Sequence, residues 1–239
     1  MTATPPPRRS VVVTGVAKSG QLGEAIALAF AREGARVSVV ARNLEEATAR
    51  ANEMRSLGFD VHPFACDLAD ATVTAGVARA IAAAAGRVDL VVHAAGGFAL
   101  TGPVADSDPA AFQLQLSIGL GTAYATARAF IPLLRATRGS LVFLASASAL
   151  PGARVKGVAG YAVAKGGVLT LMRAIAQEEH EHGVRANAIA PAAIRTQANA
   201  AAMPANARFV EPSSVVAAIR YLASPEAAQV TGQVIELAP

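Results

Sequence analysis

The fold is decided by the stretch Ser10-Val-Val-Val-Thr14-Gly-Val-Ala-Lys-Ser-Gly-Gln-Leu-Gly23, in which a short apolar run leads into a glycine-rich one. The β-branched run at its start predicts a buried strand, and the segment from Leu22 to Glu33 predicts a helix. Glycines between a strand and a helix let the backbone turn tightly and let a pyrophosphate approach the positive end of the helix. The strand–loop–helix order favours a dinucleotide-binding turn, with a ligand-free glycine-rich turn as the alternative.

The same alternation of apolar runs and Ala-rich amphipathic segments continues along the chain. Further strands are expected at 36–41, 61–66, 88–93, 140–145, 184–190 and 233–237, and further helices at 44–57, 71–85, 109–137, 160–182 and 212–223. Strands that are apolar throughout and separated by helices indicate a parallel sheet buried on both faces. With right-handed crossovers, the prediction is a single doubly wound α/β domain over residues 10–239, with seven parallel strands and helices on both faces.

The composition supports one domain with a substantial core and argues against several classes of partner. The chain has 239 residues, of which 53% are hydrophobic and 16% charged. The formal charge of +4, from 21 basic and 17 acidic residues, is scattered, which argues against a nucleic-acid partner. Cys66 is the only cysteine, which excludes an internal disulfide and fits a reducing compartment.

The first nine residues are expected to form a flexible tail. They hold three prolines and two arginines but no apolar core of a signal peptide. No apolar run in the sequence is long enough to span a bilayer, so no membrane partner is expected. We therefore expect a cytoplasmic protein.

Tyr161-Ala-Val-Ala-Lys165 offers the most specific chemistry in the sequence. The spacing places a phenol and an ammonium on one face of the helix predicted over 160–182, one turn apart. A free tyrosine titrates near pH 10, and a fixed positive charge nearby would lower its pKa toward the working range of a proton donor. The alternative is a core aromatic beside a solvated lysine, and the surrounding motifs decide between the two.

Arg42 follows the second predicted strand, where an NAD-binding domain places an acid against the ribose 2′-hydroxyl. An arginine at this position favours a 2′-phosphate instead, and Lys18 in the glycine-rich loop adds a second cation. The alternative is that both side chains are simply solvated. The sequence therefore predicts NADP(H) as the cofactor.

These motifs, with others in the same order, make the chain similar to the short-chain dehydrogenase/reductase family along nearly its whole length. The residues that carry the resemblance are Gly15 to Gly23, Asp67-Leu68, Ala94-Ala-Gly96, Ser146, Tyr161, Lys165, Pro191-Ala-Ala-Ile-Arg-Thr196 and Val230-Thr-Gly-Gln-Val234. The resemblance, in particular to members like 3-oxoacyl-acyl-carrier-protein reductase, implies a Rossmann fold. It also implies hydride transfer between a nicotinamide and a carbonyl or secondary-alcohol substrate.

The resemblance implies a role for each matching residue. Tyr161 would be the general acid in carbonyl reduction, Lys165 would bond the nicotinamide ribose and lower the pKa of Tyr161, and Ser146 would hold the substrate oxygen. Asp67 would accept a hydrogen bond from the adenine amino group, and no metal is expected. The residues expected to contact the cofactor are Gly15, Lys18, Ser19, Gly20, Leu22, Gly23, Arg42, Asp67, Leu68, Ala94, Ala95, Gly96, Tyr161, Lys165, Pro191, Ile194 and Thr196.

Four features depart from the family pattern. The glycine-rich loop is two residues longer than usual, with Gln21 where a glycine is normally found, and His93-Ala-Ala-Gly96 replaces Asn-Asn-Ala-Gly. Gly119 aligns with the asparagine that in the family helps to hold a proton-relay water. Ser146 lies two residues further from the tyrosine than is common, and Ser148, at the common spacing, stays a rival for the serine role.

The histidines give weaker evidence of a catalytic or metal-binding role. His93 ends a buried strand, which favours a structural role over a catalytic one. His180 and His182 lie on a charged helix end, where solvation is expected and metal binding is the alternative.

The favoured function is an NADP(H)-dependent reductase or alcohol dehydrogenase. A cofactor-binding protein with little turnover is the first alternative, because Gly119 and the altered loop remove usual parts. A methyltransferase is the second, and Arg42, Tyr161 and Lys165 argue against it.

The segment 197–210, where the family carries its substrate lid, is short and Ala-rich. The helices predicted over 109–137 and 160–182 have more apolar surface than one sheet face needs. In the family that the chain resembles, these helices pair across two-fold axes, so the resemblance implies a homotetramer, with a dimer as the fallback.

Overall fold

The structure, a computed structural model, describes residues 8–239 and contains one parallel sheet. Its strands stand in the order β3-β2-β1-β4-β5-β6-β7, and every neighbouring pair is parallel, which confirms the predicted seven-stranded parallel sheet. The strands are β1 (Ser10–Thr14), β2 (Arg36–Ala41), β3 (Val61–Ala65), β4 (Leu90–His93), β5 (Ser140–Leu144), β6 (Arg185–Pro191) and β7 (Val234–Leu237).

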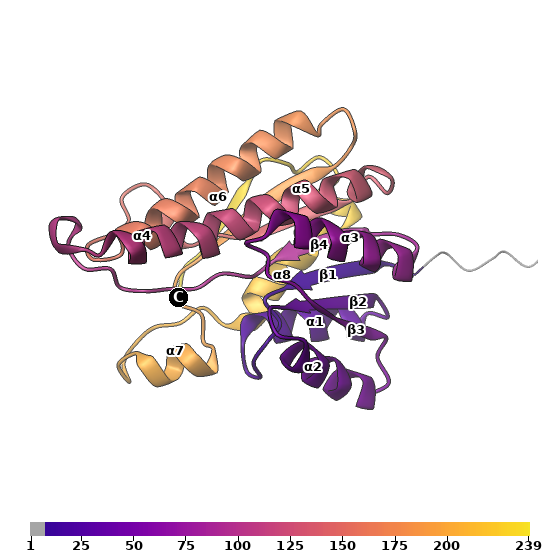
Figure 1. Cartoon of the computed structure of the whole chain (residues 1–239), viewed down its shortest axis with the longest axis horizontal. Coiled ribbons are helices and arrows are strands. Elements are labelled where there is room, and N and C mark those ends of the chain that lie inside the picture. The colour runs from indigo at the N-terminus through magenta and orange to yellow at the C-terminus, as the bar shows by residue number, and fades with distance from the viewer. Residues whose placement is uncertain (1–7) are drawn as a thin grey trace, which may run out of the picture.

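Helices cover both faces of this sheet (Figure 1). One face carries α1 (Leu22–Arg32), α2 (Leu44–Ser56) and α8 (Pro212–Ala223), and the other carries α3 (Ala71–Ala85), α5 (Thr122–Arg135) and α6 (Ala159–Glu178). Side chains of β1 alternate between the two cores: Val11 and Val13 pack with the first set of helices, and Val12 packs with the second. The doubly wound single domain predicted from the sequence is therefore confirmed.

Local sequence signals fix where several helices begin and end. Asp70 caps α3 by accepting hydrogen bonds from the N–H groups of Thr72 and Val73, and Gly86 ends the same helix in the left-handed conformation. Asn43 caps α2 in the same way. Proline occupies the first turn of α8, where its missing N–H costs nothing.

From β1 the chain adds β2 and β3 on one side of the sheet, and from β4 it adds β5, β6 and β7 on the other side. The connections that follow β1 and β4 therefore lead away from each other. Loops that follow the carboxyl ends of such strands leave a crevice between them, which is where α/β sheets of this kind bind ligands. Here the loops after β1 and β4 approach closely: a Cβ at Gly15 would lie 2.9 Å from the carbonyl of Ala94. Gly15 has a φ of +78°, so both its space and its conformation require glycine.

Four predicted boundaries differ from the structure. The helix expected over 109–137 is α4 (Pro109–Leu116), a π turn, η2 (Ser117–Gly121), and α5. The helix expected to reach His182 ends at Glu178, and the segment 197–210 contains a short helix that the sequence did not predict, α7 (Gln197–Ala202). Of the predicted tail, residues 1–7 lie outside the described residues, whereas Arg9 is half-buried and its carbonyl accepts a hydrogen bond from the N–H of Arg36.

Candidate active site

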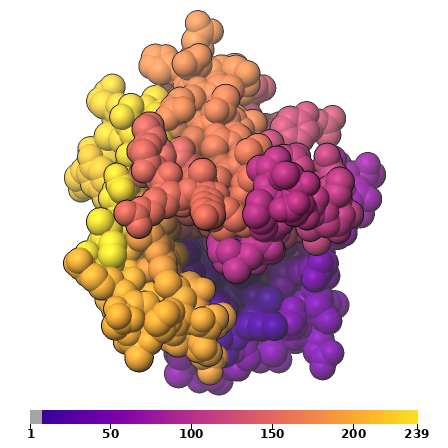
Figure 2. Space-filling view, turned by 90° about the vertical axis from the view of Figure 1, so that its left-hand side faces the viewer, coloured from indigo at the N-terminus to yellow at the C-terminus, as the bar shows by residue number. Residues whose placement is uncertain are grey.

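A cavity of about 510 Å³ opens at the carboxyl ends of the strands. In Figure 2 the surface is hollowed between the golden segment around residue 200 and the magenta segment around residue 110, with indigo N-terminal residues at the bottom. The structure brings eight of the residues expected from the sequence to this cavity: Leu22, Ala94, Gly96, Ser146, Tyr161, Lys165, Pro191 and Ile194. Further residues that the sequence reasoning missed also line it, among them Phe98, Arg154, Asn199 and Met203.

Tyr161 stands in the first turn of α6 and is largely enclosed. Burial raises the pKa of its phenol, and the side-chain hydrogen bond with Ser146 works in the opposite direction. The ring of Phe98 meets the ring of Tyr161 edge-on, with 5.1 Å between the centroids and 81° between the planes. Phe98 itself is 63% exposed, so its ring forms part of the wall of the cavity.

Lys165 lies one turn further along α6 and is buried at the wall of the cavity. Its Nζ donates a hydrogen bond to the carbonyl oxygen of Leu144 at 2.7 Å, and burial lowers its pKa to about 8. A Cβ at Gly96 would stand 3.4 Å from this Nζ, so the absence of a side chain at Gly96 leaves the ammonium open to the cavity.

The effect of Lys165 on the pKa of Tyr161 stays a prediction. The pKa of the phenol is raised in this structure, because burial outweighs the hydrogen bond with Ser146, and Lys165 is not among the causes of the shift. The helical spacing put both side chains on one face correctly. It could not reveal that a backbone carbonyl at the end of β5 would hold the ammonium.

Ser146 and Ser148 are both present at the cavity, and they are bonded to each other. Ser146 Oγ accepts a hydrogen bond from the N–H of Ser148 at 3.2 Å and another from its hydroxyl at 3.0 Å. Ser146 is also the serine whose hydrogen bonding lowers the pKa of Tyr161. Ser146 thus lies between the phenol and Ser148, and Ser148 orients its hydroxyl.

His93 is held in a buried chain of polar groups that joins β1, β4 and α5. Thr14 Oγ1 accepts a hydrogen bond from the N–H of Ala95 and lies 3.3 Å from His93 Nδ1. Thr122 Oγ1 lies 3.3 Å from His93 Nε2 and donates to the carbonyl oxygen of Ile118 at 2.8 Å. Burial and the charge of Lys165 lower the pKa of His93 to about 3, so the imidazole is neutral at physiological pH and serves structure rather than proton transfer.

The glycine-rich loop has the shape that a dinucleotide phosphate needs. A Cβ at Gly23 would collide with the carbonyl oxygen of Gly15, so the loop and the start of α1 can approach each other only with glycine at position 23. The N-cap of α1, Gln21, makes no side-chain capping bond, which leaves the positive end of the helix open to an anion. The residues present therefore fit a nicotinamide dinucleotide.

The cations expected at the 2′-phosphate lie at the same edge of the sheet. Arg42, after β2, and Lys18, in the loop after β1, are both exposed. The N–H groups of Gly15 and Val16 donate to the carbonyl oxygen of Val40 at 2.9 and 3.1 Å, which ties the start of the loop to the end of β2. Ser19 and Gly20 are exposed in the same loop.

The remaining predicted residues surround these loops. Asp67 is exposed just after β3, and its Oδ1 accepts a hydrogen bond from the N–H of Ala69 at 3.1 Å, while Leu68 is buried beside it. Ala95 follows Ala94 in the loop after β4 and is half-buried. Thr196 is buried and caps α7 by accepting a hydrogen bond from the N–H of Asn199 at 3.2 Å.

The residues that sequence reasoning missed stand on loops or on the short helix α7. Asn199 donates from Nδ2 to the carbonyl oxygen of Ile194 at 2.9 Å, which holds α7 against the end of β6. Arg154 and Phe98 belong to loops without periodicity, so no pattern in the sequence indicated that they would face the cavity. A dense run of alanines around Asn199 was the one available signal for a helix there.

Residues 8–239 contain neither a candidate metal cluster nor a candidate membrane span. No cluster of three or more potential metal-ligating side chains lies in this part of the chain; His180 and His182 are exposed. Within the same residues, no helix combines the length and the apolar character needed to cross a bilayer.

Known proteins resemble this chain in both sequence and structure. A family model described as Enoyl-(Acyl carrier protein) reductase matches residues 15–237. D-threitol dehydrogenase of Mycolicibacterium smegmatis is 32% identical, covering 92% of this chain and 88% of that protein. Galactitol 2-dehydrogenase of Rhizobium johnstonii is 30% identical, with coverages of 95% and 92%.

The solved structure of a short-chain type dehydrogenase/reductase from Mycobacterium ulcerans superposes with a TM-score of 0.88 at 28% identity, covering 95% of this chain and 87% of that one. A short chain dehydrogenase from Mycobacterium smegmatis gives a TM-score of 0.86, also at 28% identity, with coverages of 97% and 92%. The likeness therefore extends over nearly the whole of each protein. Together with the parallel sheet, the glycine-rich loop and the Tyr161–Lys165 spacing, it places the chain in an oxidoreductase family: this protein belongs to the short-chain dehydrogenases/reductases.

Proposed function

We propose that this protein is an NADP(H)-dependent oxidoreductase that transfers a hydride between the nicotinamide ring and a carbonyl or secondary-alcohol substrate. One observation carries the proposal: Tyr161, Ser146 and Lys165 line a single cavity at the carboxyl ends of the strands. A phenol, a hydroxyl and an ammonium around one cavity offer a proton donor, a hydrogen-bond donor and a fixed positive charge to a substrate oxygen. The nicotinamide, when bound, supplies the hydride.

Each of the three side chains has a distinct task. Tyr161 donates its phenolic proton to an oxygen that gains negative charge, and the hydrogen bond with Ser146 lowers the pKa of the phenol against the effect of burial. Ser146, oriented by Ser148, stabilises the same oxygen. Lys165, held in place by the carbonyl of Leu144, keeps a positive charge at the wall of the cavity. Its open side toward Gly96 suits a contact with the ribose hydroxyls of the cofactor.

The preference for NADP(H) over NAD(H) rests on charge. Arg42 and Lys18 are exposed at the edge where β1 and β2 end, and Arg42 stands where an acid would bind the 2′-hydroxyl of NAD. A guanidinium forms charge-assisted hydrogen bonds to a phosphate, which supports binding of the phosphorylated cofactor.

The cavity supports a substrate with both an apolar and a polar or anionic part. Val158, Phe98 and Met203 provide apolar surface, and Asn199 provides an amide. Among the described residues that line the cavity, Arg154 and Lys165 are charged and none is acidic. The names of two relatives point to polyols, and resemblance points to 3-oxoacyl thioesters, so both classes belong in a substrate screen.

The test is a carbonyl screen followed by a comparison of variants. NADPH oxidation would be measured with ketoses, 2-oxo acids and a 3-oxoacyl thioester, first with the unaltered protein. Tyr161→Phe should then lower the single-turnover rate on any accepted substrate by about 10²-fold or more. It should leave NADPH affinity unchanged. Tyr221→Phe, at an exposed position of α8, is the matched control and should keep full activity.

The alternative function is a cofactor-binding protein with little turnover. Gly119 favours it, because glycine at this position of the π turn has no side chain with which to hold a relay water. Equal single-turnover rates for the unaltered protein and Tyr161→Phe would support this alternative against the oxidoreductase.

We further propose that the protein is a cytoplasmic homotetramer, with a dimer as the fallback. Support comes from apolar side chains on the outer surface of α4, α5 and α6: Leu114 is 57% exposed, Tyr124 53% and Val163 53%. Exposed apolar groups on adjacent helices suit burial against a second copy across a two-fold axis.

A further inference from the structure

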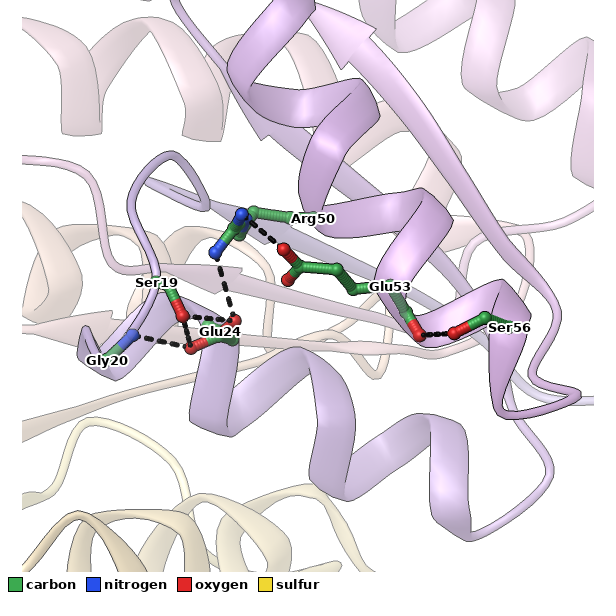
Figure 3. A network of polar contacts seen from close by, with 6 residues as sticks. All are labelled: Ser19, Gly20, Glu24, Arg50, Glu53 and Ser56. Carbon is green, nitrogen blue, oxygen red and sulfur yellow. Dashed lines mark hydrogen bonds and ion pairs between the residues drawn. The ribbon is translucent and has the colours of Figure 1, made fainter.

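Glu24 binds the loop that precedes its own helix. It stands in the first turn of α1, and its carboxylate reaches back to the loop that precedes the helix (Figure 3). The N–H of Gly20 donates to Glu24 Oε2 at 2.7 Å, and the hydroxyl of Ser19 lies 3.3 and 3.4 Å from the two carboxylate oxygens. The loop donors are therefore already bound to an anion that belongs to the chain itself.

These are donors of the kind that bind phosphate. A backbone N–H and a serine hydroxyl beside the positive end of a helix form a ready anion site. Gly20 is also the point where α7 joins the loop, because its carbonyl oxygen accepts a hydrogen bond from the N–H of Gln197 at 3.0 Å. A carboxylate at Glu24 thus holds the part of the loop that faces α7.

The charge of Glu24 is only partly balanced. Arg50 on α2 places Nη1 3.5 Å from Glu24 Oε1, but it gives its shorter ion pair, 2.5 Å from Nη2, to Glu53. Figure 3 shows Arg50 standing between the two acids. One guanidinium therefore serves two carboxylates. Arg50 Nε is buried and has no hydrogen-bond partner within the described residues, so Arg50 retains a donor for Glu24 if the loop releases it.

We propose that Glu24 sets the affinity of the glycine-rich loop for the phosphates of the dinucleotide. Its carboxylate competes with them for Gly20 N–H and Ser19 Oγ, and it repels them by charge. Arg50 receives the carboxylate when the phosphates enter. The ligand in this inference rests on the proposed function, but the competition does not require that the protein turn over a substrate.

Glu24→Gln separates this role from simple helix capping. A glutamine keeps an oxygen that can accept from Gly20 N–H, so the cap survives while the negative charge is lost. The thermal midpoint of the ligand-free protein should therefore change little. The dissociation constant for NADPH, measured by fluorescence titration at low ionic strength, should fall by about three- to tenfold. The gain should shrink as salt is added, because salt screens the repulsion.

Glu178→Gln is the matched control. It removes an exposed carboxylate at the end of α6, and it should change the NADPH dissociation constant by less than about twofold. Arg50→Gln should weaken NADPH binding, because Glu24 then keeps its full charge beside the loop. In the double variant Arg50→Gln/Glu24→Gln that loss should disappear, which marks a coupled pair.

The outcomes are distinguishable. An unchanged or weaker NADPH affinity in a folded Glu24→Gln protein makes Glu24 a capping residue and overturns the inference. Tighter binding by Glu24→Gln without turnover of any substrate overturns the proposed oxidoreductase function and leaves the inference standing. If neither NADPH nor NADH binds to the unaltered protein or to Glu24→Gln, the inference and the cofactor proposal fall together.

Discussion

Lys165 Nζ donates its hydrogen bond to the carbonyl oxygen of Leu144, so the ammonium on α6 is fixed to the end of β5 rather than to the phenol of Tyr161. This bond joins the helix that carries the candidate acid to the strand that leads to Ser146. The bond therefore links the α6 side of the cavity to the β5 side, and the ammonium that makes it is a buried positive charge.

The buried ammonium should make stability depend on pH. The pKa of Lys165 is lowered from 10.5 to about 8, so between these values the unfolded chain binds more protons than the folded one. Stability from this group therefore rises as pH increases from about 8 to 10.5, by up to about 3 kcal/mol. Urea unfolding of the unaltered protein and of Lys165→Met at pH 7, 8.5 and 10 would measure it. A constant difference between the two proteins would contradict the lowered pKa.

The phenol of Tyr161 should titrate above its ordinary range in the ligand-free protein. Burial raises its pKa, and the hydrogen bond with Ser146 moderates the increase, so Ser146→Ala should raise the pKa further. The measurement is the ultraviolet titration of phenolate in each protein minus that of its Tyr161→Phe partner. A Ser148→Ala variant should shift the midpoint less than Ser146→Ala. A larger shift from Ser148→Ala would reverse the order of the two serines.

Gly119 should not accept a side chain. A Cβ there would lie 2.9 Å from the Cβ of Ala164 on α6, closer than side chains approach. Gly119→Ala should therefore destabilise the protein by about 1–3 kcal/mol, and Gly119→Asn by more. Gly166→Ala is the control, because nothing lies within 4 Å of a Cβ at Gly166, and there alanine should be neutral or stabilising. Chemical denaturation of the three variants gives the comparison, and equal effects at the two glycines would disprove the tight contact.

Arg42 should determine the choice between cofactors. Arg42→Asp removes a cation that can pair with the 2′-phosphate and adds a repelling charge. The ratio of the NADH to the NADPH dissociation constant should fall by an amount equivalent to about 1–3 kcal/mol. Arg173→Asp, at an exposed position of α6, controls for the change in total charge. Equal affinity of the unaltered protein for NADPH and NADH would remove the basis for this prediction.

The exposed apolar side chains of α4 and α6 should mediate assembly. Light scattering of the unaltered protein at micromolar concentration should report a tetramer, or a dimer as the fallback. Val163→Asp together with Leu114→Lys should reduce that mass, since each places a charge in a buried contact. Leu57→Lys, at a residue 62% exposed just after α2, should leave the mass unchanged. A monomeric unaltered protein contradicts the assembly outright.

The sequence predicted the sheet and most helices because their signals are local. Ser10–Thr14 and the other strands are apolar runs bounded by glycine or charge, and their boundaries in the structure agree within one or two residues. The π turn at 117–121 escaped prediction, because its residues have helical character and only the packing of Gly119 against Ala164 distinguishes it.

The sequence predicted only those site residues that belong to recognisable motifs. Spacing put Tyr161 and Lys165 on one face, but the direction of the pKa of Tyr161 depends on burial, which no spacing reveals. Glu24 resembled an ordinary first-turn acid in the sequence. Its contact with Gly20 depends on the path of a loop two residues longer than usual, which only the three-dimensional structure supplies.

The π turn between α4 and α5 constrains the length of the chain as well as its composition. One extra residue in a helical turn rotates everything that follows by roughly 100°. Because of this rotation, Phe130 and Leu134 of α5 pack in the core against the sheet, while Leu114 of α4 is exposed. Many substitutions on either side would leave this arrangement intact. Deletion of a single residue within 117–121 would turn the whole apolar stripe of α5 away from the sheet, so this short segment should not tolerate a change in length.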